Sequence, residues 1–331
     1  MSTPWISRTI EEALEPALPI CDPHHHLWDH PGHRYLLDEL IEDTGGGHNV
    51  ISTVFVECTS EYRTSGPASL KPVGETEFVE RIANQCAQAG HSTRCAAAIV
   101  SYADLTLGAQ VKPVLEAHMQ ASERFRGIRH ACGWDASDAI RNSHTNPPPE
   151  LYLDAAFREG FQCLGELGLS FDAWLYHPQL GELVSLARAF PQTTIVLDHV
   201  GGPLGIGPYS GKRESIMSAW RNDICELAAC DNVVVKLGGL AMKVNGFDWH
   251  KREAPPTSDE LAEANRDYYL HCIDAFGPAR CMFESNFPVD KASVSYTVLW
   301  NAFKKLSSGF SAEERSELFC DAAHRAYRIE I

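Results

Sequence analysis

The sequence predicts an α/β fold, a closed (β/α)8 barrel that uses residues 1–331 as a single domain. Three observations lead to this prediction. Eight short runs rich in β-branched and apolar residues alternate with longer segments of helical periodicity. Neither an internal repeat nor a charge-rich linker divides the chain, and hydrophobic residues make up 44% of it. Eight strand-then-helix units favour closure into a barrel, with an open doubly wound sheet as the structural alternative.

The predicted strands are short and are followed by polar or glycine-rich sequence. They cover residues 20–26, 50–58, 95–102, 126–132, 163–171, 194–200, 233–237 and 281–287. Apolar stripes at helical spacing lie over 77–89, 179–190 and 216–228. Gly90, Gly160 and Gly277 follow helical runs, where a glycine is expected to end the helix. Because loops that follow barrel strands form the catalytic face, we expect the long loops 59–75, 135–150 and 241–259 there.

Composition excludes several partners. Lys plus Arg number 28 and Asp plus Glu 44, so the formal charge is −16, which disfavours nucleic acid and anionic membrane. No apolar stretch approaches the length of a membrane span, and the first twenty residues lack a secretion signal. The 11 cysteines form no C-x-x-C pair, which indicates reduced core thiols and a cytoplasmic protein. The oligomeric state stays open, a homo-oligomer included.

Histidines stand at the end of the first predicted strand, in Asp22-Pro23-His24-His25-His26. Alternate side chains of a strand share a face, so His24 and His26 point the same way while His25 packs outward. Two imidazoles at this spacing suit one metal ion, although a histidine-rich strand end without metal is equally compatible with the motif alone.

Other strand ends carry polar side chains as well. His199 ends the sixth predicted strand, Glu57 the second, and Glu284 and Asn286 the eighth. Strand ends of a barrel converge on one mouth, so these groups are expected to meet there. For Glu284, a buried ion pair with Lys236 is the structural alternative.

Three strand motifs together resemble the amidohydrolase superfamily, and most closely its amidohydrolase-2 branch of lactonases and related hydrolases. They are D-x-H-x-H at 22–26, L-D-H-x-G at 197–201 and S-[DN]-x-P at 285–288, supported by similar stretches at 125–130, 169–172 and 235–240. The resemblance implies a distorted TIM barrel. Members hydrolyse sugar lactones and lactones from aromatic degradation, and relatives decarboxylate or hydrate related acids. Many bind one divalent metal, often zinc, whereas some lactonases of the branch need none.

The resemblance assigns His24, His26 and His199 as catalytic residues and as ligands of one zinc ion, or as a metal-free cluster that polarises a carbonyl. One departure matters, because the family has an aspartate at the position of Asn286 that takes a proton from water. A carboxamide accepts no proton at neutral pH. We therefore expect Glu57, or one of His130, His177 and His250, to replace that aspartate.

The substrate is expected to be small and either anionic or cyclic. Arginine binds carboxylates in a bidentate manner, and Arg129 lies near the catalytic end of its strand, so it is predicted to bind a substrate carboxylate. The other predicted substrate-binding residues lie just past strand ends: His130, Trp174, His177 and His250.

The sequence thus predicts a hydrolase that opens the lactone ring of a small carboxylated sugar or of an aromatic-degradation intermediate. A decarboxylase or another lyase on the same scaffold is the first alternative, since barrels support many chemistries. A catalytically silent binding barrel, with Asn286 as the mark of lost activity, is the second.

Overall fold

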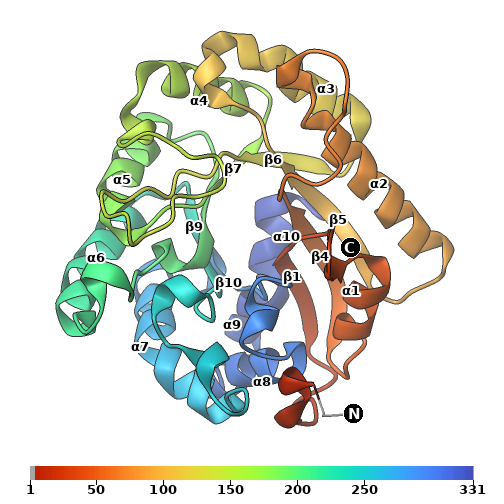
Figure 1. Cartoon of the computed structure of the whole chain (residues 1–331), viewed down its shortest axis with the longest axis vertical. Coiled ribbons are helices and arrows are strands. Elements are labelled where there is room, and N and C mark those ends of the chain that lie inside the picture. The colour runs from red at the N-terminus through yellow and green to blue at the C-terminus, as the bar shows by residue number, and fades with distance from the viewer. Residues whose placement is uncertain (1–3, 331) are drawn as a thin grey trace.

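Eight parallel strands form one sheet that curls into a barrel (Figure 1). The computed structural model describes residues 4–330. In order around the sheet, the strands are β1 (Pro19–His25), β4 (Asn49–Val56), β5 (Arg94–Ser101), β6 (Phe125–Arg129), β7 (Ser170–Ala173), β8 (Ile195–Leu197), β9 (Val233–Leu237) and β10 (Cys281–Phe283). Each pairs in parallel with the next along the chain, which the connecting helices make possible.

The first and last strands close the ring at their carboxyl ends. His25 and Phe287 form an isolated parallel bridge, and the amide of His26 donates to the Phe287 carbonyl at 2.8 Å. The amide of Asn286 donates to the His24 carbonyl at 3.0 Å. The predicted (β/α)8 barrel is therefore confirmed. The hydrogen bonds that close it join the two strand ends in which the sequence placed His24, His26 and Asn286.

Helices cover the outside of the ring. They are α1 (Leu37–Thr44), α2 (Val73–Gln88), α3 (Lys112–Ala121), α4 (Ala155–Glu166), α5 (Leu180–Ala189), α6 (Arg213–Ala228), α7 (Ser258–Phe276), α8 (Tyr296–Leu306), α9 (Ala312–Ser316) and α10 (Ala322–Tyr327). The predicted helices over 77–89, 179–190 and 216–228 correspond to α2, α5 and α6. A small antiparallel hairpin of β2 (Trp28–His30) and β3 (His33–Tyr35) had no counterpart in the prediction.

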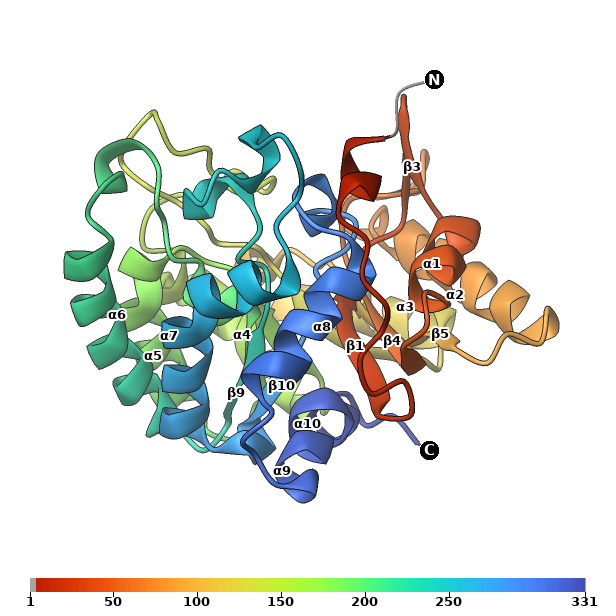
Figure 2. The same ribbon diagram turned by 90° about the horizontal axis from the view of Figure 1, so that it is seen from below.

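Side chains along the strands alternate between the barrel interior and the helix layer. Val54 and Val56 pack inside with Val100, whereas the intervening Phe55 belongs to the outer core beneath the helices. Tyr327 of α10 joins the inner cluster, so this helix closes the barrel at one end. The loops after β6 and β9 gather at the opposite end, away from α9 and α10 (Figure 2). The predicted catalytic face is thus the open end of the barrel.

The fifth predicted strand, 163–171, was placed too early. Helix α4 extends to Glu166, and β7 begins only at Ser170. The Asp154 side chain accepts from the Phe157 amide at 2.8 Å and starts the helix, and Phe157 then lies on one buried face with Phe161 and Leu164. The predicted helix end at Gly160 was wrong for the same reason.

Among residues 4–330, none of the helices combines the length and the apolar character that crossing a bilayer requires.

Gly160 offers a test of this packing, because a side chain there would meet the backbone. An added Cβ would lie 2.1 Å from the Leu105 carbonyl oxygen. Alanine normally stabilises a helix interior by about 0.5–1 kcal/mol over glycine, but overpacking costs about 1–3 kcal/mol. Gly160→Ala should therefore lower the free energy of unfolding, measured in urea. Gly181→Ala in α5 is the control, since nothing lies within 4 Å of its Cβ; equal effects of both substitutions would contradict the argument.

Candidate active site

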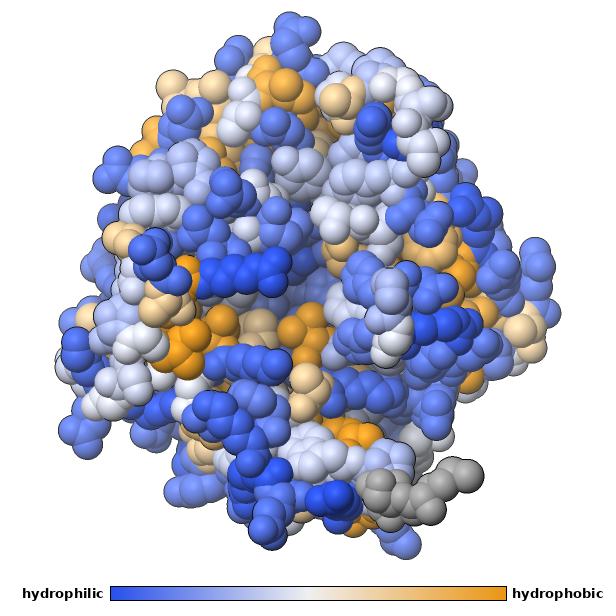
Figure 3. All heavy atoms as spheres, in the orientation of Figure 1, coloured by the Kyte–Doolittle hydropathy of each residue, from blue (hydrophilic) through white to orange (hydrophobic). Residues whose placement is uncertain are grey.

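A cavity of about 410 Å³ opens at the carboxyl ends of the strands. Viewed into the open end, the surface is hollowed at its centre, with hydrophilic residues in the hollow and hydrophobic ones beside it (Figure 3). The polar lining from the strand ends consists of His26, Arg129, His199 and Asn286. Aromatic and aliphatic walls come from Trp28, Trp174, Tyr176, Met242, Val244 and Val289. The loop after β6 adds Arg141, Asn142 and His144.

The histidines of β1 adopt the predicted alternation. The rings of His24 and His26 lie with centroids 4.9 Å apart, whereas His25 faces outward against Phe55 and Thr53. His26 Nδ1 lies 2.7 Å from the Val56 carbonyl, which can only accept, so this nitrogen carries the proton. The Nε2 atom of His26 is then left with a free lone pair. Burial and the neighbouring His24 hold the pKa of His26 well below its usual value, which keeps the ring neutral.

One carboxylate orients two further histidines. Glu284 lies directly after β10, and its Oε1 is 2.6 Å from His199 Nδ1 while its Oε2 is 2.8 Å from His24 Nδ1. Burial alone would raise the pKa of Glu284, but His199 and His24 lower it to about 2. The ionised carboxylate accepts from His199 Nδ1, so the His199 ring presents Nε2 as a lone pair. His24 Nδ1 lies at ion-pair distance from the other oxygen and 3.2 Å from Lys236 Nζ. Pairing a histidine with a carboxylate is the usual way to fix a ligand tautomer.

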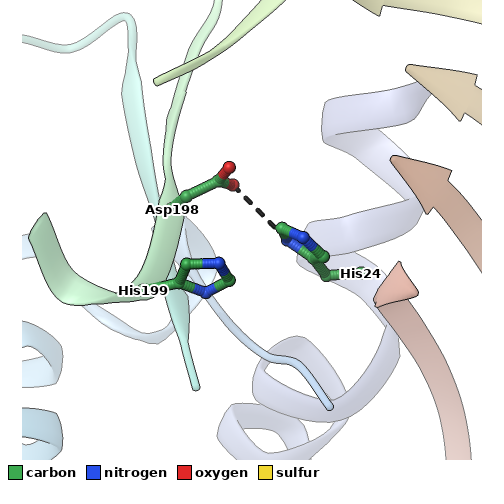
Figure 4. Close-up of side chains that lie close together, drawn as sticks. All are labelled: His24, Asp198 and His199. Atoms are coloured by element: carbon green, nitrogen blue, oxygen red, sulfur yellow. Dashed lines mark ion pairs between the residues drawn. The ribbon is translucent and has the colours of Figure 1, made fainter. Parts of the chain in front are cut away.

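Asp198 completes a compact group with these rings. His24, Asp198 and His199 bring possible ligand atoms within 4.8 Å of one another, and Asp198 Oδ1 lies 3.6 Å from His24 Nδ1 (Figure 4). Burial raises the pKa of Asp198, but Lys236 and His24 outweigh it and hold that pKa well below its usual value. The carboxylate is therefore charged at neutral pH.

Two cations lie beneath this group. Lys236 Nζ is 2.6 Å from Asp172 Oδ2 and 3.0 Å from Asp198 Oδ1, so the lysine pairs with these carboxylates and not with Glu284, which was the structural alternative. Arg129 Nη1 lies 3.4 Å from Asp198 Oδ2 and 3.3 Å from His24 Nε2. Buried charges are stable only when they are paired, and here each cation bridges carboxylates from different strands.

The donor set fits a divalent metal. His24, Asp198 and His199 place possible ligand atoms within 4.8 Å of one another, and His26, with an unprotonated Nε2, lines the same cavity as His199. Imidazole nitrogens and carboxylate oxygens are ligand types that zinc accepts. The carboxylates Glu57, Asp172, Asp198 and Glu284 are all fully buried, against the cations Arg129 and Lys236. A bound dication would balance this excess of negative charge. His24 Nε2 is available to a metal only when Arg129 Nη1 gives up its contact.

The backbone is strained where it presents these side chains. His199 and Asn286 have φ values of 53° and 55°, a left-handed conformation that costs a non-glycine residue about 1–3 kcal/mol. Gly239 permits the His199 position, because an added Cβ would lie 2.4 Å from the imidazole ring. Both strained residues follow barrel strands, so the turn geometry aims them at the mouth.

The side chain of Asn286 is held by Asp290. Its Nδ2 donates to Asp290 Oδ1 at 3.1 Å, and Asp290 Oδ2 accepts from the Ala241 amide at 3.2 Å. Burial raises the pKa of Asp290 to about 7. The amide nitrogen is thus directed at Asp290, which leaves the amide oxygen of Asn286 as the acceptor available to a water or a substrate hydroxyl.

Glu57 lies behind the cavity wall rather than in it. Its Oε1 accepts from Arg129 Nε at 2.7 Å, and its Oε2 lies 3.0 Å from His144 Nε2. Burial would raise the pKa of Glu57, yet Arg129 and His144 lower it to about 2. A carboxylate with so low a pKa and both oxygens occupied is a poor proton acceptor, which weighs against Glu57 as the base expected from the sequence.

Arg129 is also less free than expected. Its Nε and Nη2 atoms donate to the side chain and the backbone carbonyl of Glu57, at 2.7 and 2.6 Å, and Nη1 faces Asp198 and His24. Only about 5% of the residue is exposed. The donors of its guanidinium group are therefore already engaged by carboxylates, a backbone carbonyl and His24 of the protein itself.

The structure brings His24, His26, His199, Arg129 and Asn286 together, with Trp174 as a wall. It does not bring the other predicted substrate-binding histidines to the cavity lining. His130 is buried against Phe157, and its Nδ1 accepts from the Leu105 amide. His177 accepts from the Leu204 amide and packs on Tyr209. His250 lies in a short turn, Trp249–Lys251.

Sequence reasoning missed three residues of the site. Asp198 precedes His199 within the quoted strand motif, and its acidic side chain was the signal that could have found it. Arg141 and His144 belong to the long loop 135–150, which was assigned to the catalytic face, but no motif marks them. Arg141 makes no ion pair with any carboxylate in the described part of the chain, residues 4–330, so its charge is available to a ligand.

Comparison with known proteins decides the family. The model of the amidohydrolase-2 family, described as amidohydrolase, matches residues 21–329. The chain belongs to the amidohydrolase-2 family.

Two relatives and one solved structure illustrate this membership. The chain is 35% identical over 324 residues to the protein y4mH of Sinorhizobium fredii, covering 94% of this chain and 98% of the relative. It is 28% identical over 238 residues to an L-fucono-1,5-lactonase of Burkholderia multivorans, covering 70% and 72%. An amidohydrolase structure from Burkholderia multivorans with bound zinc has a TM-score of 0.72 at 24% identity and covers 94% of this chain and 99% of its own. This amidohydrolase therefore shares the barrel of the zinc-bound structure.

The donor set predicts that the purified amidohydrolase carries about one divalent metal ion per chain, measured by inductively coupled plasma mass spectrometry. His199→Ala should lose most of it, since this substitution removes a ligand and frees Glu284. His91→Ala is the matched control, because His91 is exposed at the other end of the barrel. Equal metal content in both variants would contradict a site at His199.

Proposed function

We propose that this amidohydrolase is a lactonase, which adds water to the ring ester of a small carboxylated sugar or of an aromatic-degradation intermediate. The observation that carries the proposal is the pair of imidazoles at the barrel mouth, His199 and His26, in which Glu284 and Val56 fix the Nδ1 protons and leave Nε2 lone pairs for the cavity. The likeness to an L-fucono-1,5-lactonase supports a ring ester as the substrate class.

The residues of the chain would divide the reaction as follows. The aromatic walls Trp28 and Trp174 hold the ring, and the amide oxygen of Asn286 orients the water. Developing negative charge on the carbonyl oxygen is stabilised by positive or polar groups fixed in advance at the site. Zinc, held by His26 and His199 with Asp198 beside His199, and by His24 once Arg129 Nη1 gives up its contact, would supply a Lewis acid that polarises the ester carbonyl when bound.

Arg141 is the residue to which we assign the substrate carboxylate. It lines the cavity, is exposed, and has no acidic partner within ion-pair distance among residues 4–330. Arg129, the residue expected from the sequence, is neutralised by Glu57 and Asp198. Arg141 therefore provides the local positive charge that an anion needs in a chain of formal charge −16.

The test is acid release from a panel of lactones, followed with a pH indicator and by mass spectrometry of the opened product. The panel combines neutral sugar 1,5-lactones with lactones that carry a carboxylate. The enzyme should open at least one of them, and His199→Ala should reduce kcat/KM by about 100- to 1000-fold, as expected when a group that stabilises the transition state is lost. Evolution of CO2 without ring opening would favour a lyase, and tight binding without turnover would favour a silent barrel.

The role of Arg141 gives a separate prediction. Hydrogen bonds to charged groups contribute about 1.5–3 kcal/mol, so Arg141→Met should raise KM for a carboxylated lactone by about tenfold or more. The kcat/KM for a neutral lactone should change by less than about threefold. Arg266→Met on the outer face of α7 is the control. An unchanged KM for the carboxylated substrate would exclude Arg141 as its anchor.

A further inference from the structure

His144 is paired with a buried carboxylate, yet it faces the cavity. Its Nε2 lies 3.0 Å from Glu57 Oε2, its side chain is 32% exposed, and it lines the same cavity as His199 and Asn286. Glu57 itself is fully buried. A histidine held from behind by a carboxylate and open to the substrate side has the arrangement of a general base with its orienting group.

The hydrogen bond to Glu57 decides which nitrogen is free. An ionised carboxylate only accepts, so His144 Nε2 carries the proton and Nδ1 of the neutral ring carries the lone pair. This Nδ1 makes no hydrogen bond to any group within residues 4–330 and is therefore available to a water in the cavity.

The other side chains near the cavity are unsuited to act as the general base. The Glu57 oxygens are engaged by Arg129 and His144. Asn286 is an amide and accepts no proton. The Nε2 atoms of His26 and His199 belong to the donor set for a metal, and His24 Nε2 accepts from Arg129. His144 thus fills the role that the asparagine at position 286 leaves empty.

We propose that His144 is the general base and acid of ring opening and that Glu57 is its positioning residue. This inference rests on the proposed lactonase function and names the group that moves the protons in it.

The step balances without a further reactant. His144 Nδ1 takes a proton from water as the water oxygen bonds to the lactone carbonyl carbon, which gives a tetrahedral oxyanion and an imidazolium. The oxyanion re-forms the carbonyl and the bond from the carbonyl carbon to the ring oxygen breaks. The ring oxygen takes the proton from Nδ1, which leaves a hydroxy acid and the neutral imidazole.

The kinetic test uses the lactone that the enzyme opens fastest. General base catalysis contributes about 100- to 10,000-fold, so His144→Gln should lower kcat at least 100-fold with KM changed by less than threefold. The same substitution at exposed His91 is the control. Added imidazole should restore part of the kcat of His144→Ala. If His144→Gln retains kcat within threefold, or changes KM alone, the proposal is overturned.

A double-mutant cycle separates the positioning role of Glu57 from its ion pair with Arg129. Glu57→Gln should lower kcat at least tenfold in the wild-type background and less than twofold in the His144→Gln background, because residues that act as one unit are not additive. Equal effects in both backgrounds would show that Glu57 acts only through Arg129. Glu57→Asp, which keeps the charge, provides the measurement should the glutamine variant fail to fold.

A measurement without substrate keeps this inference separate from the proposed function. Long-range ¹H–¹⁵N spectra of the histidine-labelled protein, assigned with His144→Gln, should show His144 in the Nε2–H form with Nδ1 unprotonated. A ring whose Nδ1 stays protonated would overturn the proposal. If the wild type opens no lactone while Nδ1 is unprotonated as expected, the lactonase proposal fails and the availability of the His144 base is upheld.

Discussion

The carboxylate of Glu284 is the constraint on which the site depends. It reaches from the end of β10 to His24 on β1 and to His199 after β8, so one buried side chain links three strands around the mouth. One oxygen accepts from His199 Nδ1 and fixes the tautomer of that ring, and the other lies 2.8 Å from His24 Nδ1. Replacing either histidine would leave a buried charge with half of its partners, which is costly in a low-dielectric interior. The interaction that orients the histidines of the site therefore also holds this end of the barrel together.

The layer beneath Glu284 alternates in charge. Asp172, Lys236 and Asp198 follow one another across β7, β9 and the turn after β8, and Tyr327 of the closing helix donates to Asp172 Oδ2 at 2.6 Å. Burying these groups costs desolvation energy, and pairing offsets that cost without making the network a strong source of stability. Its consequence is rigidity: each charged group is held by partners on different elements, and the histidines above it are held in turn.

The fold could be predicted largely from the sequence because parallel strands buried on both faces leave continuous apolar runs. The one misplaced strand, 163–171, failed because Phe161 and Leu164 suit a buried helix face as well as a strand. The histidines of β1 were predictable since strand geometry fixes which side chains share a face. Arg141 and His144 were not, because the path of a loop is set by tertiary contacts. The ion pairs of Arg129 could not be predicted from its own strand either, because its partners Glu57 and Asp198 come from other strands.

The loop after β6 is held by hydrogen bonds to the rest of the barrel mouth, and it carries both Arg141 and His144. Ser143 donates through its amide to the Gly133 carbonyl at 2.8 Å, and the Tyr176 hydroxyl donates to the Arg141 carbonyl at 2.6 Å. The anchor assigned to the substrate and the group assigned to proton transfer are thus encoded within four consecutive residues, outside every barrel strand. Exchange of this loop into a homologous barrel that keeps the carboxylate of Glu57 would transfer substrate choice and proton chemistry together while the strands and their charged core stayed unchanged.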